Sequence, residues 1–153
     1  IESANDFNIP RIAQMTQKTN QFNLTTHRYT DADIKKFLSE GWKIWCISVK
    51  DKFGDNGITG CIMVEGNRID TLLLSCRILG KGIEFAFVKV VLALLKEQGV
   101  DMVTAEYIPT QKNAQVADLY DRCGFEPFGD GKYQLALSNA NLEIESYYHI
   151  NIN

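Results

Sequence analysis

Several features are scarce in this chain of 153 residues, and each scarcity excludes a class of protein. Only two histidines occur, and the four cysteines form no Cys-x-x-Cys pair, so we expect no metal site. The formal net charge of -3 and the lack of a lysine and arginine stripe argue against nucleic acid as a partner. The longest apolar run, 85–95, is interrupted by Lys89 and is too short to span a bilayer. No signal peptide opens the sequence, and we expect a cytoplasmic protein without membrane contact.

The composition that is present is typical of one globular domain. Hydrophobic residues make up 45% of the chain and charged residues 23%, which is enough for a sizeable core. The cysteines lie inside apolar segments and are expected as reduced core thiols, although Cys76 is also a candidate nucleophile. Because the first residue is Ile1, we expect residues 1–9 to be a linker from a missing N-terminal region and 10–153 to form a single domain.

A glycine-containing turn joins an apolar strand to a long apolar helix at residues 72–83. A helix that begins in this way has unpaired N–H groups at its positive end, and glycines let a phosphate approach the main chain. The turn therefore predicts an anion site, with Arg77, Gly80 and Gly82 in the order Arg-x-x-Gly-x-Gly. This spacing does not fit a Walker loop, because no Gly-Lys-Ser/Thr follows, and it does not fit a dinucleotide fingerprint, because Phe85 takes the third glycine's place. The rival interpretation is that Arg77 and the glycines only shape the turn.

Apolar periodicity and capping residues predict the helices. One helix begins at Pro10, and another begins at a capping box of Thr30 and Asp33 and ends before Gly41. Two more are expected over 83–98 and around 116–123.

Alternating and β-branched residues predict the strands. These are 42–50, 58–65, 68–77, 100–107, 125–128 and 132–137. Residues 51–57, which include the Asn56-Gly57 pair, are expected to form a hairpin loop, and the tail 142–152 to add an edge strand. The helix 83–98 then connects parallel strands by a right-handed crossover.

Together, Arg77, Gly80 and Gly82 before a helix, with Asn113, Tyr120, Gly124 and Phe125 downstream, resemble the two signature motifs of the GNAT acyltransferases. The resemblance implies an α+β (mixed α/β) GNAT fold, with a mixed central sheet and helices on both faces. It also implies acetyl-CoA or coenzyme A as cofactor, with the pantetheine arm in a slot between diverging parallel strands and paired with free backbone of the strand that ends near Cys76. The implied cofactor-binding residues are Cys76, Arg77, Leu79, Gly80, Lys81, Gly82, Ile83 and Asn113.

The same resemblance assigns Tyr120 as the general acid that protonates the departing thiolate. Helical spacing alone makes Tyr120 an aromatic core residue, and Asn113 is equally a helix-start residue. The general base is open. Glu106, near the end of its strand, is the first candidate, with Asp70 and His27 behind it.

A second likeness covers nearly the whole chain. The residues that carry it are 11–23, 53–57, 74–80 and 107–113, and they are similar to the C-terminal half of FkbH-like proteins of methoxymalonate (polyketide extender-unit) biosynthesis. It accounts for the amide- and hydroxyl-rich stretch 19–26, which composition alone leaves open between a structural and a binding role. It implies an N-terminal HAD-like domain outside this chain and an acyl carrier protein as partner, whose phosphopantetheine replaces coenzyme A.

Three hypotheses follow. The first is an acyltransferase-like domain of an FkbH-like protein that acts on an acyl thioester of coenzyme A or of a carrier protein. The second is a free-standing N-acetyltransferase of a small amine. The third is a non-catalytic module that docks a carrier protein. A basic rim of Arg77, Lys81, Lys112 and Arg122 would suit an acidic carrier protein.

Overall fold

A single mixed sheet forms the centre of the molecule. The computed structural model describes residues 1–75 and 82–153, and its seven strands lie in the order β1-β2-β3-β4-β5-β7-β6. The strands are β1 (Glu2–Ser3), β2 (Lys43–Asp51), β3 (Gly54–Glu65), β4 (Arg68–Leu74), β5 (Met102–Glu106), β6 (Glu126–Gly129) and β7 (Lys132–Ala136). The helices are α1 (Ile9–Lys18), α2 (Asp31–Ser39), α3 (Ile83–Glu97) and α4 (Leu119–Arg122). Among the strands of the described residues, β4 and β5 alone pair in parallel, as the predicted crossover through α3 requires.

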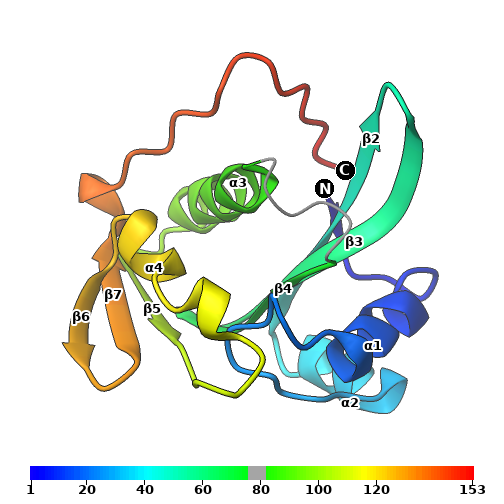
Figure 1. Ribbon diagram of the computed structural model, residues 1–153, viewed down its shortest axis with the longest axis horizontal. Helices are drawn as coiled ribbons and strands as arrows, with labels where there is room; N and C mark the ends of the chain where they lie inside the picture. Colours follow the sequence, from blue (N-terminus) through cyan, green and yellow to red (C-terminus); the bar gives the residue numbers. More distant parts are fainter. Residues whose placement is uncertain (76–81) are drawn as a thin grey trace.

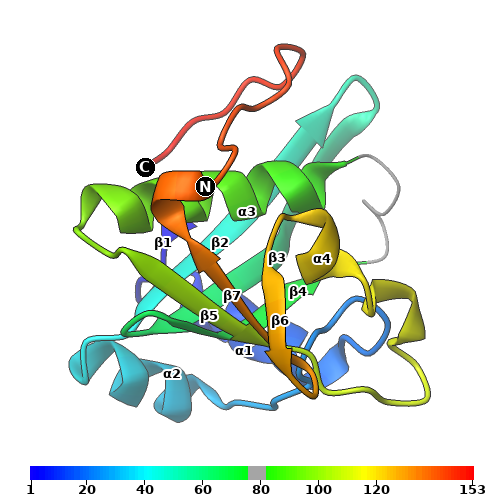
Figure 2. The same ribbon diagram turned by 90° about the vertical axis from the view of Figure 1, so that its left-hand side faces the viewer.

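Helices cover both faces of the sheet, and each face has its own hydrophobic core (Figure 1). On one face α3 buries residues such as Phe87 and Leu95 against Leu72 and Leu74. On the other face α1 and α2 pack on the first strands, mainly through Ile12 and other aliphatic side chains. Figure 2 shows α3 and α2 on opposite sides of the strands. The expectation of a mixed sheet with helices on both faces is therefore confirmed.

Local sequence signals set the first two helices. Proline stands at the start of α1, where its missing N–H costs nothing. The predicted capping box begins α2: the Thr30 hydroxyl accepts from the Asp33 N–H, and the Asp33 carboxylate accepts from the Thr30 N–H. Both helices thus lie where the pattern predicted them.

The β2–β3 hairpin is longer than predicted. Asp51 pairs with Gly54, so Lys52 and Phe53 form the turn, and the Phe53 N–H donates to the Asp51 carboxylate at 2.8 Å. The loop was expected over 51–57, but β3 begins at Gly54, and the Asn-Gly pair lies within β3 at a register shift between Ser48 and Lys50 of the partner strand. An Asn-Gly pair can form a bulge as readily as a turn, because both need a positive φ.

The two ends of the chain also differ from expectation. Residues 1–9 do not behave as a linker, because Glu2–Ser3 pairs with β2 and Ile9 is buried in α1. The tail contains no edge strand; it crosses the α3 face, held by a hydrogen bond from Lys89 Nζ to the Glu143 carbonyl at 2.7 Å (Figure 1). The Asn153 N–H then donates to the carbonyl of Ile1, so both ends meet beside β2.

Candidate functional site

The parallel strands β4 and β5 separate soon after they meet. They pair only through Arg68 with Thr104 and Ile69 with Ala105. Directly after this contact β4 bulges: Val64 of β3 pairs with Ile69 and Met63 pairs with Thr71, so Asp70 has no partner residue on β3. A bulge turns a side chain away from its regular direction and often lies beside an active site. The divergence of β4 and β5 is therefore the first candidate site.

Four residues of the chain itself, 22–25, occupy this divergence, and we call them the inserted segment. The Leu24 N–H donates to the Leu72 carbonyl at 3.1 Å, and the Leu74 N–H donates to the Phe22 carbonyl at 3.0 Å. On the other side the Ile108 N–H donates to the Leu24 carbonyl at 2.8 Å. The inserted segment thus lies like a short strand between the two diverging chains. The expectation of free β4 backbone for a pantetheine arm is wrong for Leu72 and Leu74.

Asn113 fixes the inserted segment. Its buried side chain donates from Nδ2 to the carbonyls of Asn23 and Ile108, both at 2.9 Å, and its Oδ1 accepts from the Thr110 N–H at 2.8 Å. These bonds connect the loop after β5 to the inserted segment. Asn113 therefore has a structural function here; its expected contact with pantetheine stays a prediction.

A hydrogen-bonded cluster surrounds the buried carboxylate of Asp70. Its Oδ2 accepts from the Tyr29 hydroxyl at 2.7 Å and from the Thr71 hydroxyl at 2.9 Å. His27 Nδ1 lies 3.3 Å from the same oxygen, and an Arg68 guanidinium nitrogen lies 3.1 Å from Oδ1. Asp70 is thus held by residues from β4 and from the stretch between α1 and α2.

These contacts keep Asp70 ionised. Burial by itself raises the pKa of a carboxyl group, but the hydrogen bonds from Tyr29 and Thr71 and the nearby His27 outweigh burial and lower the pKa of Asp70. For Tyr29, burial and the hydrogen bond to the carboxylate both raise the pKa. The cluster is a charged network at neutral pH.

The start of α3 carries the described part of the expected anion site. Gly82 precedes the helix with a φ of 72°, and a Cβ there would lie 2.9 Å from the Tyr148 hydroxyl. Only glycine fits easily, because the backbone is left-handed and the space is filled. Ile83 begins the helix and is buried. Cys76, Arg77, Leu79, Gly80 and Lys81 lie outside the described residues, so their assigned roles stay predictions.

The two residues predicted to catalyse lie in different surroundings. Tyr120 is 1% exposed and packs between Phe125 and Tyr133, with ring centroids 5.1 and 5.6 Å away. Burial raises its pKa, so the phenol keeps its proton, as an acid must. Glu106 ends β5 half-buried, opposite Lys132 of β7. The inserted segment lies between β4 and the residues that follow Glu106. The catalytic roles of Tyr120 as general acid and of Glu106 as general base stay predictions.

A basic hollow of about 530 Å³ lies where β4 ends. Its charged lining side chains within the described part are Arg11, Lys18 and Lys112, and no described carboxylate lines it. Lys112 was expected at a basic rim and is found here, whereas Arg122 lies over the Phe85 ring at 4.7 Å. The hollow has the charge needed for an anionic ligand.

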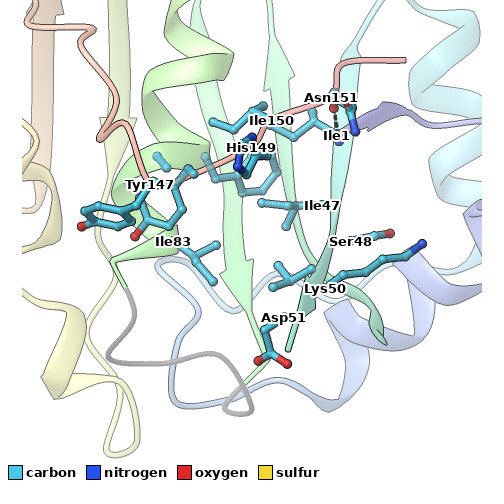
Figure 3. A pocket seen from close by; sticks show the side chains of 14 residues that line it. Ile1, Ile47, Ser48, Lys50, Asp51, Ile83, Tyr147, His149, Ile150 and Asn151 are labelled. Atoms are coloured by element: carbon cyan, nitrogen blue, oxygen red, sulfur yellow. Dashed lines mark hydrogen bonds between the residues drawn. The ribbon is translucent and has the colours of Figure 1, made fainter. Parts of the chain in front are cut away.

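A second hollow of about 410 Å³ opens on the α3 face (Figure 3). The tail forms one wall with Tyr147 and Ile150, and Ile47 of β2 and Ile83 of α3 form the others. Most of these walls are apolar. The cluster around Asp70 lies on the other face of the sheet, with α1 and α2. Tyr29, which bonds to Asp70, packs edge-on against Phe37 of α2.

The described thiols are poor nucleophiles. Burial raises the pKa of Cys46 to about 11 and that of Cys123 to about 12, and it raises the pKa of Cys61 as well. Among residues 1–75 and 82–153, His, Cys, Asp and Glu side chains form no cluster of three that could hold a metal ion. The same residues include no helix long and apolar enough to cross a membrane.

Comparison with solved structures identifies the fold. A putative GNAT acetyltransferase from Desulfovibrio desulfuricans superposes with a TM-score of 0.63 at 14% identity, covering 88% of this chain and 96% of the other. An N-acetyltransferase from Staphylococcus aureus gives 0.61 at 14%, covering 88% and 96%. A Mycobacterium tuberculosis protein, solved with coenzyme A and NLQ, gives 0.62 at 16%, covering 82% and 70%. The chain therefore has the GNAT fold. No family model and no curated protein matches it.

Sequence reasoning found parts of this site but not their arrangement. Asp70 and His27 were considered separately, behind Glu106, whereas the structure brings them into contact. Tyr29 and the inserted segment were missed. The one available signal was the amide- and hydroxyl-rich stretch 19–26, which contains all four residues of the inserted segment.

Proposed function

We propose that this chain is the acyltransferase-like domain of an FkbH-like protein and handles an acyl thioester carried by coenzyme A or by the phosphopantetheine of an acyl carrier protein. The observation that carries the proposal is the divergence of β4 and β5 directly after Ile69, with a bulge and a charged cluster at the branching point. This is the place where the resembled family receives its thioester arm. The basic hollow beside the end of β4 adds positive charge for a phosphate group.

The inserted segment sets a condition on this function. An arm that pairs with β4 must first displace residues 22–24 from Leu72 and Leu74, and that displacement lowers the net affinity. An arm seated in the basic hollow needs no such displacement. The filled divergence also favours a second candidate, a module that docks a carrier protein without catalysis.

Calorimetry with coenzyme A, acetyl-CoA and holo acyl carrier protein tests the proposal. We expect coenzyme A or the holo carrier protein to bind, and the acylated form of the carrier that binds to be consumed. Binding of the carrier protein without turnover selects the docking module, and no binding of any ligand rejects both functions. Rapid thiol release with a small amine and acetyl-CoA alone, slowed by Tyr120→Phe, selects a free-standing N-acetyltransferase.

Two glycine variants locate the phosphate. Gly82→Ala should weaken binding about tenfold or more if the start of α3 holds the anion, because a tenfold loss corresponds to about 1.4 kcal/mol of binding free energy. Gly99→Ala is the control: Gly99 has a φ of 89° at the other end of α3, with open space around it. Both variants should lower stability, but equal affinity in the two would place the anion elsewhere.

A further inference from the structure

We propose that His27 is the general base of this acyl transfer and that Asp70 is the positioning residue that holds its imidazole. The inference rests on the proposed function, and it replaces Glu106 as the first candidate for the base.

The geometry of the pair defines the two ring nitrogens. His27 Nδ1 lies 3.3 Å from Asp70 Oδ2. Because an ionised carboxylate only accepts hydrogen bonds, Nδ1 must carry the proton in the neutral ring. Nε2 then holds the free lone pair. The His27 side chain is 35% exposed and that of Asp70 is 4% exposed, so the basic end of the pair is the accessible end.

Asp70 is fixed well enough to orient a ring. Tyr29 and Thr71 donate to the same oxygen that faces His27, and Arg68 binds the other oxygen. Arg68 is itself held by Glu65, at 3.2 Å. A carboxylate with both oxygens engaged in this way cannot rotate freely, and a buried carboxylate beside an imidazole fixes its tautomer.

The pair also lies at the right place in the fold. Asp70 is the bulged residue at which β4 leaves β5, and His27 follows the inserted segment by two residues. The Thr25 hydroxyl, at the end of that segment, donates to the Asp70 carbonyl at 2.9 Å. Glu106, in contrast, has no hydrogen-bond partner for its carboxylate within the described residues.

The step balances with His27 as the base and Tyr120 as the predicted acid. An acceptor amine or hydroxyl attacks the thioester carbonyl carbon while its proton passes to His27 Nε2. The new bond to carbon forms, the carbon–sulfur bond breaks, and the electron pair leaves with sulfur. The thiolate then takes a proton from Tyr120, the predicted general acid, and the imidazolium proton passes through water to the phenolate, which returns Tyr120 and His27 to their neutral forms.

Nitrogen-15 NMR tests the geometry without any turnover. His27 and His149 are the only histidines, so His149→Gln assigns the signals. We expect neutral His27 to carry its proton on Nδ1, and Asp70→Asn to shift the tautomer balance. A proton on Nε2 in the neutral ring would overturn the inference.

Kinetics tests the role. With acetyl-CoA or S-acetyl-N-acetylcysteamine as donor and hydroxylamine as acceptor, His27→Ala should lower kcat about 100-fold or more, with added imidazole restoring part of the rate. Asp70→Asn should lower kcat more than it raises KM, and His149→Ala should do neither.

The outcomes separate the two proposals. Full activity of His27→Ala, or a loss that imidazole does not rescue, overturns the base and leaves the acyltransferase standing. Wild-type protein that consumes no thioester overturns both, whatever the tautomer of His27.

Discussion

At the residue scale, Asp70 is a charged side chain that the fold has buried. A buried carboxylate is costly unless donors and a counter-charge surround it, and Tyr29, Thr71 and Arg68 supply both. Removing the charge while keeping the shape therefore leaves donors without their best acceptor. The sequence could mark Asp70 as a polar residue in an apolar strand, but not its partners, because Tyr29 lies 41 residues away along the chain.

Acid should weaken the wild type more than Asp70→Asn. The lowered pKa of Asp70 in the folded state means that its contribution to stability is present above the unfolded value of about 3.9 and is lost as the pH falls through the folded pKa. Near pH 7 Asp70→Asn should cost about 1–3 kcal/mol, and the stability difference should shrink below about pH 4. Urea unfolding at several pH values measures this.

Asp55→Asn is the matched control, because Asp55 and its partner Lys50 are exposed and 3.8 Å apart. It should change stability little at any pH. An equal acid dependence of the two variants would show that the Asp70 network does not stabilise the fold.

At the element scale, the inserted segment forms backbone hydrogen bonds to both neighbours as a strand does, although it is only four residues long. Its backbone bonds satisfy donors and acceptors that the divergence of β4 and β5 would leave unpaired, and buried backbone groups need such partners. Apolar periodicity in the sequence predicted the helices and the regular strands, whereas residues 22–25 show no such periodicity. Asn56 and Gly57 show the same limit of sequence-based prediction. They lie at a bulge in β3 and not in the hairpin loop, and bulges and turns favour the same residue types.

Asn113→Ala should loosen this element. The variant removes the side-chain bonds to Asn23, Ile108 and Thr110 and leaves buried carbonyls unpaired, so it should lower the free energy of unfolding by about 2–4 kcal/mol. Amide exchange at Leu24 should accelerate. Asn141→Ala, which removes only an exposed bond to the Glu143 N–H, should change neither measurement. Unchanged exchange at Leu24 in Asn113→Ala would mean that β4 alone holds the segment.

At the scale of the whole molecule, the tail connects elements that are distant in sequence. It crosses α3 and reaches β2, where its last residue pairs with the first (Figure 1). Its alternating sequence predicted a strand, but the tail meets the sheet edge only at Ile1, whose backbone bonds with the Asn151 carbonyl and the Asn153 N–H. The tail instead forms one wall of an apolar hollow that Ile83 and Phe87 also line.

Two neighbouring tyrosines test the tail. Tyr148 is partly buried against the core on the α3 face and should cost about 1–3 kcal/mol when replaced by Ala. Tyr147 is 71% exposed, and its replacement by Ala should cost less than about 0.5 kcal/mol. Thermal unfolding of the two variants gives the comparison. Equal costs would show that the tail does not clamp this face.

The sequence by itself determined the helices and most strands, because periodicity and caps act over neighbouring residues, and its resemblance to the GNAT signature motifs implied the fold. Only the tertiary structure decided that residues 22–25 fill the divergence of β4 and β5 and that His27 meets Asp70. These contacts join residues more than 40 positions apart, and their free energy comes from burial and hydrogen bonds that exist only once the sheet has formed.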